Sequence, residues 1–198
     1  MPDQYHTIER SAIAEFKDRG SKFIAYSFPV DTVHEFKEKL ALIKKEHPKA
    51  SHHCFAYRLG LDENNFRVSD DGEPSGSAGR PILGQIDSKQ LTNVLVIVVR
   101  YFGGTLLGVP GLINAYRSAA ALALQLAPII QRPVLIQYRL QFDYTQINDV
   151  MKIARRCSCV ILKQELQLFC LLELAIPKTR TEIVMDKLKN LGVTAERI

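Results

Sequence analysis

The stretch from Thr92 to Val99, with the sequence TNVLVIVV, limits the possible folds more than any other part of the chain. It is rich in β-branched residues, which favour strands, and both of its alternating faces are apolar. A strand with two apolar faces needs cover on both sides, as a central strand in a layered sheet has. The sequence therefore predicts a central strand here, with other elements packed against each face.

Two strands and a helix are expected before Pro48. Residues 5–8 and 21–26 predict strands separated by a polar stretch. Asp31 or Thr32 can cap a helix that ends before Pro48, because apolar residues recur between them every three to four positions.

The pattern changes after the central strand. Thr105 to Gly111 is a glycine-rich entry into an alanine-rich helix, and the helical pattern breaks around Pro128 to Pro133. The remainder follows the order β-α-β-β-α-β, which is that of a split βαβ or ferredoxin-like unit. The sequence thus predicts an α+β fold with two domains, residues 1–130 and 134–198. In the second domain, strands are expected over 135–144, 160–166, 169–176 and 193–198, and helices over 145–156 and 179–191.

Composition excludes several classes of protein. Apolar residues make up 46% and charged residues 24% of the chain, which excludes a disordered or fibrous protein. Apolar runs such as Val94 to Val99 are far shorter than the roughly 20 residues of a membrane span. The first ten residues, MPDQYHTIER, lack the apolar segment of a secretory signal. We therefore expect a cytoplasmic protein with no membrane contact.

Charge permits a polyanionic partner without requiring one. The chain carries 26 basic and 21 acidic residues, a net charge of +5. Four basic residues with no acid between them are candidate nucleic-acid contacts: Lys152, Arg155, Arg156 and Lys163. The first three gather at the C-terminal end of an expected helix, where the helix dipole favours cations in any case. A solvated helix end therefore explains them as well as contact with phosphates does. No aromatic platform for stacking RNA bases is visible.

The four cysteines do not predict a metal or disulfide site. The pair Cys157 and Cys159 lacks the spacing of zinc modules, and no histidine follows His53. We expect free, mostly buried thiols and no cofactor.

The strand expected over residues 51–59 holds the first candidate site residues. Alternation places His53 on one face with aromatic residues, and His52 and Cys54 on the other. Cys54 and His52 could form a nucleophile and base, but no orienting acid is evident from the sequence. A small buried thiol beside a surface histidine is the simpler interpretation.

The acidic loop that begins SDDGEP admits three interpretations. Asp70, Asp71 and Glu73 could shape a binding groove, could bind Mg²⁺ or Ca²⁺, or could hold a tight loop through bonds from side chain to backbone. In the last case Ser75 and Ser77 are expected to cap a helix that begins near Ala78.

A glycine-rich segment follows the central strand. Arg100 and Tyr101 lead into Gly103 and Gly104, whose backbone N–H groups could approach an anion. The spacing is that of neither a P-loop nor a dinucleotide-binding motif. Arg100 could bind a phosphate, or it could pair with Asp70 or Glu73 and join the two loops.

Taken together, SDDGEPSGSAGRPIL and VVRYFGGTLLGVPGLINAY resemble the YigZ/IMPACT family, and the strand that contains His52, His53 and Cys54 matches that family too. The resemblance implies an N-terminal two-layer α/β domain of ribosomal-protein type, shared with elongation factor G and GHMP kinases. It also implies a C-terminal ferredoxin-like domain similar to the last domain of elongation factor G. Eukaryotic relatives restrain a kinase of translation initiation through an extra N-terminal domain that we do not expect here. The family also carries a label of proline peptidase. A metal-dependent peptidase would need a set of metal-binding residues, and we cannot assemble one from this sequence.

Three hypotheses follow, the third being a protein-interaction module in which changes at neither set of candidate residues would affect RNA or ligand binding. In the first, the protein is a non-enzymatic binding protein that contacts RNA, the ribosome or a translation-associated protein, and no residue is catalytic. In the second, it is a small-molecule enzyme or phospho-ligand binder that uses a groove around Arg100. The expected groove residues are His52, His53, Asp70, Asp71, Glu73, Arg100, Tyr101, Gly103 and Gly104.

Overall fold

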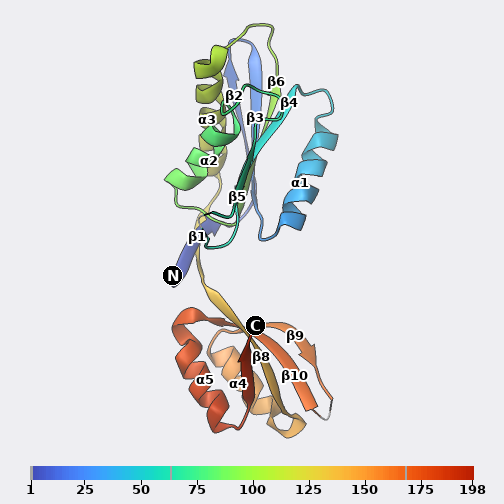
Figure 1. Ribbon diagram of the computed structural model, residues 1–198, viewed down its shortest axis with the longest axis vertical. Helices are drawn as coiled ribbons and strands as arrows, with labels where there is room; N and C mark the ends of the chain where they lie inside the picture. The colour runs from blue at the N-terminus through green and yellow to red at the C-terminus, as the bar shows by residue number, and fades with distance from the viewer. Residues whose placement is uncertain (1, 63, 168) are drawn as a thin grey trace. The chain divides into compact units, whose positions relative to one another are not determined.

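The chain forms two compact units. The computed structural model describes residues 2–62, 64–167 and 169–198. The first unit holds Tyr5–Arg132, and the second holds residues 2–4 together with Pro133–Ile198 (Figure 1). That residues 1–130 and 134–198 fold as independent domains stays a prediction.

A five-stranded antiparallel sheet organises the first unit, with the strand order β2-β3-β6-β4-β5. The residues of β6 from Val94 to Val99 are fully buried, so the predicted central strand is confirmed. The strands are β2 (Ala12–Asp18), β3 (Ser21–Pro29), β4 (His52–Arg58), β5 (Phe66–Ser69) and β6 (Val94–Tyr101).

Helices cover both faces of this sheet. Helix α1 (Val33–Glu46) lies on one face, and α2 (Gly79–Ser88) and α3 (Gly108–Leu126) lie on the other (Figure 1). Alternate residues of β6 enter two separate hydrophobic cores, one on each side of the sheet. The expected two-layer arrangement is therefore wrong. Because both faces of β6 are apolar, the unit has three layers.

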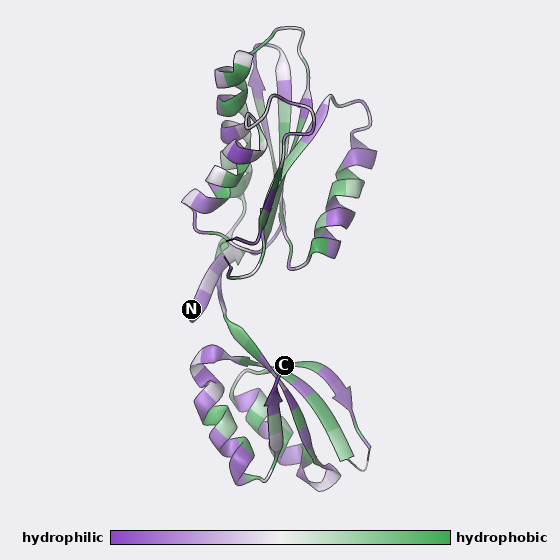
Figure 2. Cartoon of the chain, in the orientation of Figure 1, coloured by the Kyte–Doolittle hydropathy of each residue, from purple (hydrophilic) through white to green (hydrophobic). Residues whose placement is uncertain are grey.

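Helix α1 begins where one of its two candidate caps predicts. Thr32 Oγ1 accepts a hydrogen bond from the Glu35 amide at 3.2 Å, and Glu35 in turn accepts one from the Asp31 amide at 2.9 Å. Phe36 and Ile43 are buried against the sheet, and the other faces of the helix are largely polar (Figure 2). Thr32, rather than Asp31, is thus the N-cap.

Three strands lie where none was expected. Strand β2 occupies the supposed polar stretch. Its core-facing residues are Ala12, Ala14 and Phe16, and Ile13, Glu15 and Lys17 alternate outward. Strand β5 follows the turn after β4. In the region of the predicted break, β7 (Ile129–Pro133) pairs with β1 (Gln4–Ile8) in a two-stranded sheet.

The second unit follows the predicted order β-α-β-β-α-β. Its antiparallel sheet has the order β11-β8-β10-β9. The likeness to the named ferredoxin and elongation-factor folds stays a prediction. The strands are β8 (Leu135–Asp143), β9 (Val160–Glu165), β10 (Phe169–Pro177) and β11 (Thr194–Arg197); the helices are α4 (Ile147–Arg156) and α5 (Thr181–Asn190); and the 3₁₀ turns are η1 (Tyr144–Gln146) and η2 (Lys178–Arg180).

This unit has a hydrophobic core of its own, in which the apolar faces of β8 and β10 pack against α4 and α5. Leu140 and Leu172, paired across the two strands, are almost fully buried in it. No helix in the described part of the chain is long and apolar enough to cross a membrane.

Candidate functional site

His52 and Arg100 lie opposite each other on neighbouring strands. They are register partners where β4 pairs with β6, so their side chains share one face of the sheet. Cys54 lies on that face too, whereas His53 turns to the other side, where its Nε2 is 3.1 Å from the carbonyl oxygen of His47. The predicted division of this strand into two faces is confirmed.

Glu73 lies at the centre of a buried polar network. Its Oε1 accepts hydrogen bonds from Arg100 Nη1 at 2.6 Å and from the Tyr116 hydroxyl at 2.7 Å. The side chains of Glu73 and Arg100 are only 3% and 6% exposed, so the ion pair is shielded from water. Of the two acids that the sequence offered to Arg100, its partner is Glu73.

The guanidinium of Arg100 has further neighbours. Its Nη2 lies 3.5 Å from Ser21 Oγ, and the rings of Phe23 and Phe102 lie 5.5 Å and 5.6 Å from its Cζ. Its Nε is buried and has no hydrogen-bond partner among the residues that the structure describes. A buried N–H donor without an acceptor is uncommon in folded proteins.

Asp70 shapes the loop from within. Its carboxylate accepts hydrogen bonds from the amides of Gly76, Ala78 and Gly79 at 2.8–3.0 Å. Partial burial acts to raise the pKa of Asp70, but these three N–H donors outweigh it and hold the pKa below its usual value. The expected cap by Ser75 and Ser77 is therefore wrong, because a carboxylate reaches the first amides of α2 from outside the helix.

Asp71 orients the two histidines. Its Oδ2 accepts a hydrogen bond from the His53 amide at 2.7 Å, and its carbonyl oxygen lies 2.8 Å from His52 Nδ1. A carbonyl only accepts, so His52 Nδ1 carries a proton and donates it. The other ring nitrogen of His52, Nε2, lies 3.8 Å from Glu73 Oε1.

These polar groups border a pocket of about 480 Å³ in the first unit. We call it the Arg100 pocket. Its volume lies within the ordinary range for small-molecule sites. Its polar edge includes His52, Glu73 and Arg100, and its apolar wall is made of Phe102, Leu106, Leu107, Val109 and Leu112.

Three of the nine predicted groove residues, namely His52, Glu73 and Arg100, line this pocket. The others have different contacts. Gly103 lies so close to Gly20 that a Cβ on it would be 1.9 Å from the Gly20 carbonyl carbon. Gly104 has a φ of 86° and open space around it. His53, Asp70 and Asp71 hold the backbone as described above, and the hydroxyl of Tyr101 lies 2.8 Å from His47 Nδ1.

The apolar wall was missed from the sequence. Phe102, Leu106 and Val109 are 50%, 83% and 46% exposed, which is unusual for a cluster of large apolar side chains. The sequence does contain an indication of this wall, namely several large apolar residues inside the glycine-rich segment. That segment was interpreted instead as a place where backbone N–H groups approach an anion.

Cys54 is a poor candidate nucleophile. Burial raises the pKa of its thiol, which lies 3.0 Å from the carbonyl oxygen of Asp70 and 3.3 Å from the Tyr116 hydroxyl. Within the described ranges, no group of three or more His, Cys, Asp or Glu side chains is arranged to hold a metal ion.

The four basic residues of the second unit do not share one environment. Lys152 lies 3.1 Å from Asp149 and Lys163 lies 2.6 Å from Glu165, both acids just outside the interval that the sequence pattern considered. Arg155 and Arg156 are exposed in the last turn of α4. These two arginines are the part of the set best placed for an external anion.

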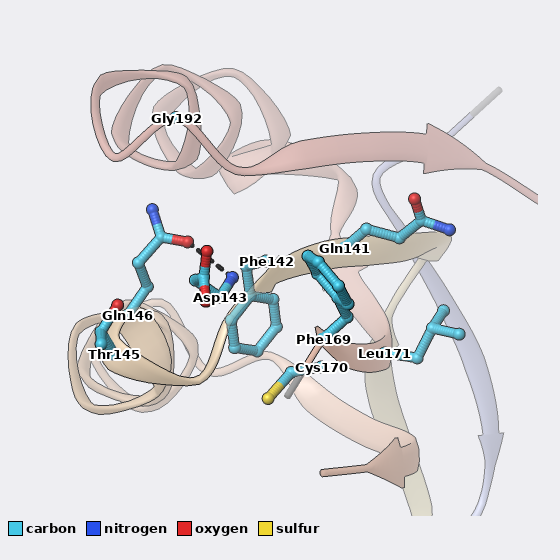
Figure 3. A pocket seen from close by; sticks show the side chains of 9 residues that line it. All are labelled: Gln141, Phe142, Asp143, Thr145, Gln146, Phe169, Cys170, Leu171 and Gly192. Atoms are coloured by element: carbon cyan, nitrogen blue, oxygen red, sulfur yellow. Dashed lines mark hydrogen bonds between the residues drawn. The ribbon is translucent and has the colours of Figure 1, made fainter. Parts of the chain in front are cut away.

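A second pocket, of about 550 Å³, lies in the second unit where β8 leads into η1 (Figure 3). Gln146 Oε1 accepts a hydrogen bond from the Asp143 amide beside it at 2.9 Å, and this fixes the turn. The ring of Phe169 lies along its edge and is 77% exposed. None of the sequence-predicted site residues lines this pocket.

Comparison with known proteins identifies the family. The model of the Impact N-terminal domain matches residues 19–124, which include the whole Arg100 pocket. The chain belongs to the IMPACT family. The IMPACT family member YigZ of Escherichia coli is 35% identical over 174 residues, which are 87% of this chain and 85% of that protein. An IMPACT family member of Haemophilus influenzae is 33% identical over 93% of this chain and 91% of its own length.

The fold of an IMPACT-family chain such as this one has a solved counterpart. A crystal structure of a hypothetical protein is 30% identical, with a TM-score of 0.83 over 100% of this chain and 98% of the other. The two-unit architecture is therefore shared with a protein solved by experiment.

Proposed function

We propose that this protein is a non-enzymatic, cytoplasmic binding protein of the translation apparatus, which contacts RNA or the ribosome. The family resemblance supports the proposal, since it implies folds akin to a ribosomal protein and to elongation factor G. Fold alone does not establish function. The observation that carries the proposal is the exposed pair Arg155 and Arg156 at the end of α4.

Two adjacent exposed arginines suit contact with a phosphate backbone. Arginine presents a planar fork of donors that matches phosphate oxygens, and each phosphate neutralised releases counterions. Arg180 adds a third guanidinium nearby, since its Nη1 lies 3.0 Å from Ser158 Oγ, just after α4. The second unit therefore offers a compact cationic surface at this helix end.

The test is binding of the full chain to purified ribosomes and to a structured RNA across a salt series. Wild-type binding should weaken steeply as salt rises, and Arg155→Ala/Arg156→Ala should lower affinity about tenfold and reduce the salt slope by about two. Lys187→Ala/Lys189→Ala is the matched control, because these two lysines end α5 in the same manner. Absence of binding at low salt, or equal loss in both double variants, would refute the proposal.

A second candidate function rests on the Arg100 pocket. A small-molecule enzyme or phospho-ligand binder would use His52 Nε2, beside Glu73, for proton transfer and Arg100 to hold an anion. The convergence of these three side chains at one pocket favours it. Loss of ligand binding in Arg100→Lys, with ribosome binding unchanged, would separate this candidate from the first.

A further inference from the structure

The Arg100 pocket has a polar edge whose charges already cancel. Glu73 and Arg100 form a close ion pair with almost no exposure to water. The apolar wall offers an added charge no counter-ion. A charged head placed against the buried pair would therefore be uncompensated, which is costly where water is excluded. The chemistry of the pocket thus disfavours a free phosphate and favours a neutral ligand.

The polar edge of the pocket calls for a ligand that supplies both a hydrogen-bond donor and a hydrogen-bond acceptor. His52 donates through Nδ1 to the Asp71 carbonyl, so in the uncharged tautomer its Nε2 is an acceptor. Arg100 Nε–H is buried without an acceptor, on a side chain that lines the pocket. These two side chains are register partners on adjacent strands, so one small group can lie against both.

We propose that the Arg100 pocket binds a small neutral molecule with an apolar body and an amide-type head, whose carbonyl accepts from Arg100 Nε–H and whose N–H donates to His52 Nε2. The apolar body lies against Leu107, Val109 and Leu112. Arg100 Nε is covered in this structure, so binding requires the half-exposed ring of Phe102, 5.6 Å from the guanidinium carbon, to move aside. This inference is independent of RNA binding, and it replaces the phosphate with a neutral head in the second candidate function.

Three matched probes carry different head groups on the same apolar body, and so test the head group alone. The ¹⁵N-labelled full chain is titrated with 4-phenylbutanamide, 4-phenylbutanoate and 4-phenylbutylamine, and separately with inorganic phosphate. The amide should bind about tenfold more tightly than either charged analogue, because each analogue lacks one of the two hydrogen-bonding functions and adds a charge. The Nε–H signal of Arg100, assigned from its loss in Arg100→Lys, should shift and exchange more slowly with water as the amide binds.

Two variants on helix α3 locate the site without disturbing the buried ion pair. Val109→Trp, at an exposed position on the pocket wall, should abolish amide binding by filling the pocket. Leu126→Trp, exposed at the other end of the same helix, should leave it unchanged.

Each other outcome overturns the inference in a different way. Tighter binding of the butanoate or of phosphate would refute the neutral head and favour the phospho-ligand candidate. Failure of all four probes would refute both. Unchanged amide binding in Val109→Trp would place the ligand elsewhere.

Discussion

Glu73 is the residue on which the buried polar groups of the first unit depend. Arg100 and Tyr116 both donate to its Oε1, and His52 faces it from the edge of the pocket. An unpaired guanidinium in such surroundings is strongly destabilising, so the carboxylate holds the arginine in place as much as it lines the pocket. A change at Glu73 would therefore confound folding with ligand binding, and variants on the apolar wall are better probes of the site.

Asp70 has a role that pH can reveal. Its carboxylate is stabilised by three amide donors in the folded chain, which hold its pKa below the usual value of 3.8. The resulting stability is present above that value and is lost as pH falls through the lower, folded-state pKa. Asp70→Asn should thus lower the free energy of unfolding by about 1–3 kcal/mol near neutral pH, and by progressively less below pH 3.8.

Urea denaturation at a series of pH values from neutral to strongly acidic measures this difference. Asp186→Asn, on the exposed face of α5, is the control and should show no comparable change with pH. A difference between wild type and Asp70→Asn that stays constant down to the lowest pH would contradict the proposed role of the carboxylate.

At the level of elements, two loops of the first unit meet through glycine. The turn between β2 and β3 touches the segment that leaves β6, where Gly20 and Gly103 lie backbone to backbone. The Gly103 amide also donates to Ser21 Oγ at 3.2 Å, and Arg100 Nη2 lies 3.5 Å from the same oxygen. This contact therefore sets the position of the segment that carries Phe102 and of the turn beside Arg100.

Adjacent glycines in that segment should respond very differently to alanine. Gly103→Ala should lower the free energy of unfolding by about 3 kcal/mol, because backbone on the other loop has to move. Gly104→Ala should cost about 1 kcal/mol, because its positive φ is the only obstacle and nothing lies within 4 Å. Urea denaturation gives both values, and the amide shift of Ser21 should change only in Gly103→Ala. Equal costs would show that the loop contact is not rigid.

At the scale of the whole molecule, the two units have separate hydrophobic cores that share no residue. Leu172→Ala removes a side chain that is 1% exposed in the second core, and should cost about 2–5 kcal/mol. Amide hydrogen exchange should then accelerate in β8 and β10 while β6 keeps its protection. Leu95→Ala, in the first unit, should give the reverse pattern. Faster exchange in both units from either change would show that they unfold together.

The sequence predicts the elements whose patterning is strong. The apolar run of β6, the spacing in α1 and the alternation in β8 and β10 are each visible over many residues. Strand β2 was missed because its core-facing Ala12 and Ala14 are weakly hydrophobic, while the exposed Ile13 between them disrupts the alternation of apolar and polar residues. Strand β7 was missed because its pairing partner, β1, is more than a hundred residues away in the sequence, so no local pattern links the two.

The candidate site was predictable only in its residue types. His52, Glu73 and Arg100 could be named from the sequence, but their proximity depends on the register of β4 against β6 and on the path of the acidic loop. Asp70 and Glu73 lie three residues apart in one loop, so the sequence could not decide which of them pairs with Arg100. Three residues of the apolar wall, Phe102, Leu106 and Leu107, belong to an irregular segment where no periodicity marks the buried side, and Val109 and Leu112 lie at the start of α3.

The N-terminal residues belong to the second unit, most of which is synthesised after the first. The Asp3 carbonyl accepts a hydrogen bond from the Val134 amide at 2.9 Å, and its carboxylate pairs with Lys178 at 2.8 Å. During synthesis on a ribosome, Asp3 therefore cannot form this ion pair until Lys178 has emerged. The early segment can join its final unit only after most of the chain has been translated, so these contacts form late in vectorial folding.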